Sequence, residues 1–339
     1  MNTKHMMATF ACAAAFCGSV QAAEAEAEKN SVDSKEESSQ GWNWAMGEGV
    51  TFNEQPIVSA EVGLAIDSKY LSYGLVDNNE PIITPSASLT LFDWLTFSVE
   101  SIFDMTKYGR RENDAGEEAY VNRAGRYQEL DPGVSLGHTF SKDDYEWLPT
   151  SVEFSFGYMY EYHPRSFNTR DDDTQFATFD ISLPDLEDLV FVTPTFSYER
   201  DIDRDNGTYL NLELAHTFAL IDGEEEGDDP VLGLCISLAQ GWGDRRRVAG
   251  YLTDFHDVSV NEDGEEEYGT LDRQGFMDTC LTASLEWAVT DGVTVGAYVA
   301  YSDYLLDRKM RDAACGYEAT GKWDHAYNFV GGVSVAVAF

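Results

Sequence analysis

The chain has 339 residues, of which 61 are Asp or Glu and 22 are Lys or Arg, so its formal net charge is −39 at pH 7. This charge excludes nucleic acid as a partner, because phosphates have to be neutralised by an excess of Lys and Arg. A strong negative field also repels anions and suits solubility in a compartment such as the periplasm.

The first 22 residues have the pattern of a secretory signal peptide. A short segment with Lys4 precedes the apolar stretch MMATFACAAAFCGSV, and small residues follow up to Ala22, where a signal peptidase would cut. No stretch of the chain approaches the roughly 20 apolar residues that a transmembrane helix needs. We therefore predict export, removal of residues 1–22 and a mature chain with a charge of about −40.

The segment 23–56 is predicted to be an acidic, flexible N-terminal segment in the periplasm. Its first part, EAEAEKNSVDSKEESSQ, has almost no apolar residues to bury and is expected to be disordered. The following GWNWAMGEG contains Trp42 and Trp44. These side chains either contact the membrane interface, plug a lumen, or belong to the flexible segment.

From residue 57 to residue 339, apolar and polar residues alternate with period two, which is the pattern of strands with one apolar face. In 150–161, for example, Val, Phe and Tyr occupy one face, and Ser, Glu and Gly occupy the other. Twelve segments show this pattern: 58–66, 83–91, 95–103, 128–140, 150–161, 176–183, 190–199, 208–219, 231–240, 276–288, 293–301 and 326–339.

The connections between these segments alternate in length. Short links such as Phe92-Asp93-Trp94 follow the even-numbered strands, whereas 104–126, 162–174, 241–274 and 302–325 follow odd-numbered strands. Transmembrane barrels have short periplasmic turns and long external loops. The sequence therefore predicts an all-β fold, a transmembrane antiparallel up-and-down β-barrel of about twelve strands, covering 57–339.

The end of the chain, AYNFVGGVSVAVAF, is amphipathic and stops at Phe339. It resembles the C-terminal strand of outer-membrane proteins, whose terminal aromatic residue is recognised by the barrel-assembly machinery. This resemblance implies location in the outer membrane, with Phe339 as an assembly signal.

The stretch SAEVGLAIDSKYLSYGLVDNNEPIITPSASLTLF, with Tyr70, Gly74 and Pro81, resembles the first hairpin of TorF-type porins. The resemblance covers about a tenth of the chain and implies a barrel with a transport function.

If the apolar face of each strand meets lipid, the opposite face lines a lumen. That face carries many carboxylates and no Lys or Arg, and a narrow channel with such a wall favours cations. The predicted lining acidic residues are Glu61, Glu100, Glu129, Asp131, Glu153, Glu161, Asp180, Glu199, Glu213, Asp278 and Glu286.

The sequence thus predicts a narrow porin-like channel for small hydrophilic solutes. The alternatives are a plugged structural or surface-interaction barrel and an enzyme active at the rim. No catalytic residue is predicted, because His138 and His216 fall on lipid-facing positions and no spacing specifies a triad. Basic loop residues such as Arg247 either fold inward as a constriction, bind phosphates of lipopolysaccharide, or pair with acidic residues of the same loops. Outer-membrane lipid and lipopolysaccharide are the expected partners.

Three cysteines remain after cleavage, an odd number that argues against a disulfide framework. Cys235 and Cys280 flank the connection 241–274, and a simple antiparallel pairing sets them opposite one another, which allows a disulfide. The alternative is two small side chains that line the wall without bonding.

The string DIDRDNG places Asp201, Asp203 and Asp205 as in the start of a calcium loop, but Gly207 comes one position late. Asn206-Gly207 also favours a hairpin turn. We predict a hairpin tip here, no metal and no cofactor, with these three aspartates as the calcium candidate.

Overall fold

The computed structural model describes residues 42–45, 49–52, 55–105, 109–112, 118–121, 125–142, 145, 147–163, 173–186, 190–223, 230–260, 266–319 and 326–339. Twelve long strands form its wall: β3 (Gln55–Asp67), β6 (Ile82–Leu91), β7 (Leu95–Asp104), β10 (Arg126–Phe140), β11 (Val152–Glu161), β12 (Thr174–Ser182), β13 (Thr193–Asp201), β14 (Thr208–Ile221), β15 (Leu232–Gly243), β18 (Gly275–Thr290), β19 (Val293–Asp303) and β20 (Asn328–Ala338).

The wall is a closed antiparallel barrel. Each strand pairs with its neighbours in the chain, and the first strand, β3, pairs with both β6 and the last strand, β20. The twelve strands coincide with the twelve segments of period-two alternation, so the predicted fold class is confirmed.

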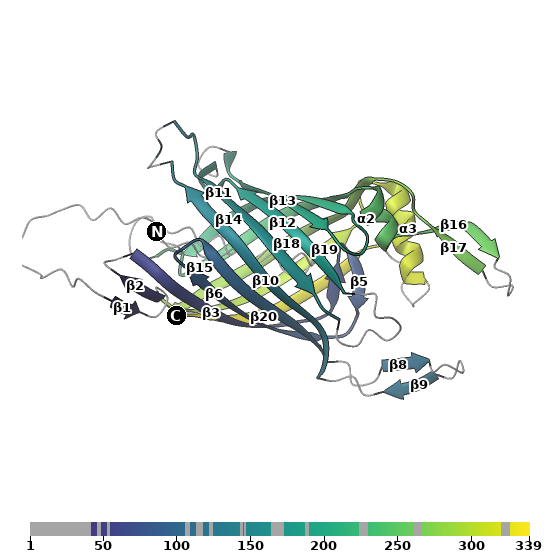
Figure 1. Ribbon diagram of the computed structural model, residues 1–339, viewed down its shortest axis with the longest axis horizontal. Helices are drawn as coiled ribbons and strands as arrows, with labels where there is room; N and C mark the ends of the chain where they lie inside the picture. Colours follow the sequence, from purple (N-terminus) through teal and green to yellow (C-terminus); the bar gives the residue numbers. More distant parts are fainter. Residues whose placement is uncertain are drawn as a thin grey trace, which may run out of the picture.

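The two ends of the barrel differ. β1 (Trp42–Ala45), β2 (Gly49–Phe52) and the C-terminus lie at one end (Figure 1). The long connections fold at the other end, where Figure 1 shows α2 (Arg245–Tyr251), α3 (Arg308–Ala319) and the hairpins β8–β9 (Gly109–Glu112, Glu118–Val121) and β16–β17 (Thr253–Val260, Glu266–Thr270). We call this the outer end, and the opposite end the inner end. Within the described residues, no helix is long and apolar enough to cross a membrane.

The outward face is apolar over most of the wall. Phe156, Val299 and Phe329 are 55%, 64% and 64% exposed, and the residues on either side of each are more buried and point inward. Exposed Trp94, in the first inner turn, and Trp287, near the inner end of β18, fit an aromatic girdle at a membrane interface. The wall therefore has the surface of a transmembrane barrel.

At the inner turn between β6 and β7, Phe92 and Asp93 both have positive φ, at 54° and 69°. Two such residues form the turn type whose twist matches that of the flanking strands. The register pairs Thr90 with Thr96, and their buried hydroxyl oxygens lie 3.0 Å apart. Both threonines therefore point into the lumen.

The assignment of all of 23–56 to a flexible segment is wrong for its last part. β1 and β2 form a hairpin, and β2 pairs with the first residues of β3 through Val50 and Val58. This pairing lies beyond the point where β20 ends, at Ala338 opposite Glu61, so β2 covers backbone of β3 that would otherwise be an open edge. Residues 1–41, with the predicted signal peptide, lie outside the described residues.

Candidate functional site: the lumen and the hairpin inside it

The register places all eleven predicted carboxylates on the inward face of the wall. Glu100, for example, pairs with Asp131 across β7 and β10, and Glu213 pairs with Thr195 and Ala239. Glu129, Asp131, Asp180, Glu199 and Asp278 are buried, whereas Glu61 is exposed and Glu100, Glu153, Glu161, Glu213 and Glu286 are half-buried. The acidic side chains thus line the lumen over its whole length.

The strand β10 begins two residues earlier than predicted, at Arg126, whose position pairs with Asp104 on the inward register. The expectation that no basic residue has an inward strand position is therefore wrong at the outer end of β10. Among the other described strand positions, the inward face carries no Lys or Arg, because Arg200 lies on the outward register with Tyr198.

Hydroxyl groups satisfy several of the buried carboxylates. Tyr209 OH donates to Asp278 Oδ1 at 2.8 Å, and Ser155 Oγ donates to Asp180 Oδ2 at 3.1 Å. These donors leave the negative charge in place, because hydroxyls carry no charge of their own.

The connection between β3 and β6 folds back into the lumen as a small hairpin, β4 (Tyr70–Ser72) and β5 (Leu75–Asn78), which we call the inner hairpin. It contacts strands that are far from one another around the barrel. Tyr70 OH donates to Glu129 on β10 at 3.1 Å, and Asn328 at the start of β20 donates its side-chain N–H to Gly74 O at 3.4 Å. Only a segment inside the barrel reaches both, so the inner hairpin fills the outer part of the lumen.

Apolar packing holds the inner hairpin in place. Leu71 is fully buried against inward side chains that include Cys280, Tyr298 and Val330. At the turn, Gly74 has φ +80°, and an added Cβ atom would lie 2.6 Å from Asp278 Cβ. The inner hairpin was not predicted from the sequence, although three aliphatic residues, Leu71, Leu75 and Val76, within a polar connection are a signal for burial.

Arg247 on α2 enters the lumen from the outer end and joins the inner hairpin to the wall. Asp244 caps α2 by accepting hydrogen bonds from the backbone N–H groups of Arg246 and Arg247. The Arg247 guanidinium is fully buried and lies 2.9 Å from Glu199 Oε1 and 3.7 Å from Asp205 Oδ2. It also stacks on aromatic rings, including that of Phe176 on the wall.

Tyr73, at the tip of the inner hairpin, completes this arrangement. Arg247 Nη1 donates to Tyr73 OH at 3.1 Å, and Tyr73 OH donates to Glu199 Oε1. Burial, and then the charge of Glu199, raise the pKa of Tyr73 well above its ordinary value although Arg247 lowers it, so the hydroxyl keeps the proton that it donates. We call Tyr73, Glu199, Asp205 and Arg247 the Arg247 cluster.

Two other described basic side chains of the outer loops pair with acidic loop residues. Arg273 lies 2.6 Å from Asp307. Arg245 lies 3.0 Å from Asp272, and the side chains of this second pair are largely exposed. Of the three interpretations of the loop bases, inward folding therefore holds for Arg247 and local pairing for these two. The side chains of Arg110 and Arg111 lie outside the described residues.

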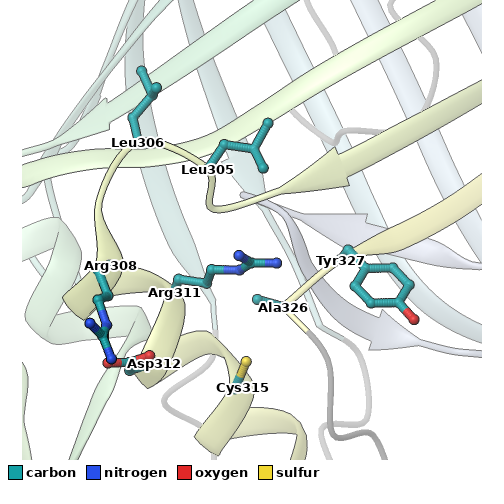
Figure 2. A pocket seen from close by; sticks show the side chains of 8 residues that line it. All are labelled: Leu305, Leu306, Arg308, Arg311, Asp312, Cys315, Ala326 and Tyr327. Carbon is teal, nitrogen blue, oxygen red and sulfur yellow. The ribbon is translucent and has the colours of Figure 1, made fainter.

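A cavity of about 620 Å³ opens at the outer end between α3 and the ends of β19 and β20. Figure 2 shows Arg311 extending across it toward Ala326, with Arg308 beside Asp312 at its edge. Arg311 Nη2 donates to Asp303 Oδ2 at 3.1 Å, so this base is already paired.

The calcium candidate is not assembled as a site. Asp201 Oδ1 accepts from the backbone N–H groups of Asp203 and Arg204, and Asp205 Oδ1 accepts from that of Gly207. The carboxylates therefore cap the backbone of their own loop, as expected for a hairpin tip. Among the described residues, the group with donor atoms close enough to share a metal ion is a different one, Glu129, Glu161 and His163.

The predicted pairing of Cys235 with Cys280 is wrong. The register sets Cys235 opposite Ser284 and Cys280 opposite Ala239, an offset of four residues, or about 13 Å along the strands. A disulfide needs Cα atoms closer than about 7 Å. Cys280 is a thiol whose Sγ lies 3.6 Å from Thr282 Oγ1, and Cys315 is a thiol as well. The offset has two causes. β15 continues to Gly243, beyond its predicted end, and a bulge after Gln240 shifts the pairing of β15 with β18.

No family model and no curated protein matches the sequence. Several solved structures match with low TM-scores and low sequence identity. An outer-membrane channel from Pseudomonas putida F1 is 12% identical, covers 84% of this chain and 96% of its own, and has a TM-score of 0.42. OprB from Pseudomonas putida is 9% identical (88% and 94% covered, TM-score 0.31), and OmpF from Salmonella typhi is 10% identical (83% and 97%, TM-score 0.30). Likeness at this level transfers no solute or activity to this chain, and the resemblance to TorF-type porins stays a prediction.

Proposed function

We propose that this protein is an outer-membrane channel for small hydrophilic solutes, that its lumen favours cations, and that the inner hairpin and the Arg247 cluster gate its outer end. The observation that carries the proposal is the acidic inward face. In the inner half of the lumen, exposed Glu61 and half-buried Glu153, Glu213 and Glu286 alternate with small residues such as Ser88. Carboxylates around a narrow aqueous path attract cations and repel anions.

Twelve strands give a lumen narrower than that of the sixteen-stranded porins. Such a lumen brings every passing ion close to the wall, so wall charge has a large effect on which ions pass. The inner hairpin narrows the path further at the outer end.

The test is electrical. The refolded protein is inserted into planar bilayers, and the reversal potential is measured under a gradient of KCl. We expect a reversal potential of the sign for K⁺ preference; a value of zero or the opposite sign overturns the proposed selectivity.

A second candidate, a plugged structural or surface-interaction barrel, is favoured by one observation. Leu71 and its neighbours fill the outer lumen, and Arg247 is fully buried beside Tyr73 and Phe176. Single-channel recording of the wild type beside a variant with residues 70–78 replaced by a Gly-Ser linker of the same length separates the two candidates. The wild type of a gated channel shows open events of its own, whereas a wild type that stays silent while the variant conducts supports the plugged barrel.

We also propose which parts of the barrel contact lipopolysaccharide and the assembly machinery. Lipopolysaccharide would contact the outer end, where exposed Arg308 and Lys309 lie on α3. The assembly machinery would recognise β20, whose terminal Phe339 exchanges backbone hydrogen bonds of 2.8 and 3.1 Å with Ala60 at the closing seam. Deletion of Phe339 should lower the amount of assembled barrel in the outer membrane without changing the conductance of the barrels that assemble.

A further inference from the structure

Four side chains with metal-binding atoms gather at one place on the inward wall. Beyond the end of the β10–β11 ladder, Leu130 and Tyr162 exchange two backbone hydrogen bonds of 2.9 Å each. Residues on either side of such a pair project to the opposite face from it. Continuing the register by one residue in each direction sets Glu129 opposite His163 and Asp131 opposite Glu161, so the four form a square that faces the lumen.

The distances within the square fit a metal ion. His163 Nε2 lies 3.3 Å from Glu129 Oε2 and 3.5 Å from Glu161 Oε1, and one donor atom of each of these three residues lies within 4.8 Å of the others. In a tetrahedral Zn²⁺ site with bonds of about 2.1 Å, neighbouring ligand atoms are about 3.4 Å apart. The three side chains therefore stand at the separations that such an ion needs.

Asp131 supplies independent support for a ligand at this position. It is only 8% exposed, its carboxyl group contacts that of Glu129, and within the described part of the chain its Oδ1 has no hydrogen-bond partner. A buried carboxylate oxygen without a donor is costly. Two carboxyl groups in contact need a shared proton or a cation to hold them together.

The inner hairpin lies against the same place. Tyr70 OH donates to Glu129 Oε1 at 3.1 Å, and the charge of Asp77 on β5 acts on Glu129 and His163. A hydroxyl that orients a carboxylate ligand is a common neighbour of metal sites. The site is thus buried between wall and hairpin, and it is rich in negative charge.

We propose that Glu129, Asp131, Glu161 and His163 bind one divalent transition-metal ion, for which Zn²⁺ fits the geometry best. An imidazole nitrogen among carboxylate oxygens favours zinc or a related transition metal over Ca²⁺ and Mg²⁺, which take oxygen ligands. Through Tyr70, the ion joins the wall to the inner hairpin. The sequence signal consists of two tripeptides on neighbouring strands, each with metal-binding side chains at its first and third positions. They are Glu129-Leu130-Asp131 and Glu161-Tyr162-His163.

The test is equilibrium Zn²⁺ binding by the refolded mature barrel without an affinity tag, after EDTA treatment and buffer exchange. We expect one Zn²⁺ per chain by elemental analysis. The variant E161Q/H163N should bind at least about 100-fold more weakly, because loss of an outer-shell partner alone costs 10–100-fold. The matched control is Glu153→Gln, which removes an inward carboxylate from the same strand far from the square; its affinity should equal that of the wild type.

Co²⁺ provides a second readout on the wild-type protein. Bound in the square, it should give the intense visible absorption of a four-coordinate site without a thiolate charge-transfer band, which separates this site from binding at Cys280 or Cys315. Heat-modifiable migration on gels reports whether E161Q/H163N is folded, and Asp131→Asn replaces it if it is not. Absence of stoichiometric binding to the wild type, a thiolate band, or equal affinity in the folded square variant and Glu153→Gln overturns the proposal.

Discussion

Arg247 Nη2 lies 2.9 Å from Glu199 Oε1 inside the barrel, and the two side chains are 0% and 1% exposed. The two residues come from different parts of the chain, because Glu199 belongs to the wall strand β13 and Arg247 to the helix of a long connection. Burial of two charges is favourable only while both are present. The position of α2 therefore depends on the charge of Glu199 on the wall strand β13.

Removal of one partner should be much more harmful than removal of both. Arg247→Met leaves the Glu199 carboxylate buried without its cation, and we expect a loss of about 3–5 kcal/mol in the free energy of unfolding or undocking of α2. The double variant R247M/E199Q should recover a large part of this loss. Urea unfolding in detergent of R247M, E199Q and R247M/E199Q, compared with the wild type in a double-mutant cycle, measures the coupling energy between the two side chains. Additive losses would show that the two groups do not interact.

Gly207 should be intolerant of a side chain because α2 packs on it. An added Cβ atom would lie 2.4 Å from the backbone N of Arg247 and 2.5 Å from its Cα. Since backbone cannot rotate away as a side chain can, Gly207→Ala should displace α2 and destabilise the protein by about 1–3 kcal/mol. Gly137→Ala is the control, because its Cβ atom meets its nearest neighbour, Phe154 O, at an ordinary 3.6 Å. Trypsin cleavage after exposed Arg245 or Arg246 reports displacement, and equal cleavage of both variants would contradict the packing argument.

Ion selectivity should fall when Glu100, Glu153 and Glu213 are replaced together with Gln. A carboxylate about 10 Å from an ion in water stabilises a cation by about 0.4 kcal/mol and destabilises an anion equally, so loss of three should reduce the cation-to-anion permeability ratio by up to about 60-fold without screening. Screening over a Debye length of about 8 Å, at about 0.15 M salt, lowers this reduction to about 3-fold. The control replaces exposed Asp222, Asp272 and Asp291 with Asn, which changes net charge equally outside the lumen. A ratio that falls equally in both triple variants would assign selectivity to overall charge.

The outer end should face the outside of the cell. In a Cys315→Ala background, Arg308→Cys places a thiol on α3, where the native side chain is 93% exposed, and Asp291→Cys places one in an inner turn. On intact cells a membrane-impermeant maleimide should label position 308 and leave position 291 unlabelled until the outer membrane is opened. The reverse pattern would invert the orientation of the barrel.

Alternation along the sequence was sufficient to predict the wall. Successive residues of a strand point to opposite faces, so Phe154, Phe156 and Tyr158 indicate both the strand and its lipid-facing side without knowledge of its partners. The inward position of the carboxylates follows from the same rule. The fold class and the faces are therefore local properties of this chain.

The contents of the lumen depend on contacts across the barrel, which local patterns do not contain. Nothing near Arg247 in the sequence indicates that it pairs with Glu199, and nothing near Tyr70 indicates Glu129. Cross-strand register has the same difficulty, because the extension of β15 to Gly243 and the bulge after Gln240 together separate Cys235 from Cys280. The square around His163 depends on both local sequence and register. Each of its i, i+2 pairs is visible in the sequence, but only the register of β10 and β11 shows that the two pairs lie opposite one another.

The inner hairpin ties barrel closure to the packing of the interior. Gly74 O accepts from Asn328, which is 254 residues later in the chain, and Tyr73 O accepts from Tyr304, 231 residues later. The hairpin is synthesised before most of the wall, yet these two partners lie just after β19 and at the start of β20, and β20 is also the strand that closes on β3. Contacts between such distant segments form late. Until β18, β19 and β20 are in place, Leu71 lacks the side chains that bury it, so an incomplete barrel exposes this apolar residue. The exposure of the inner hairpin is therefore expected to differ between an unfinished barrel and a finished one.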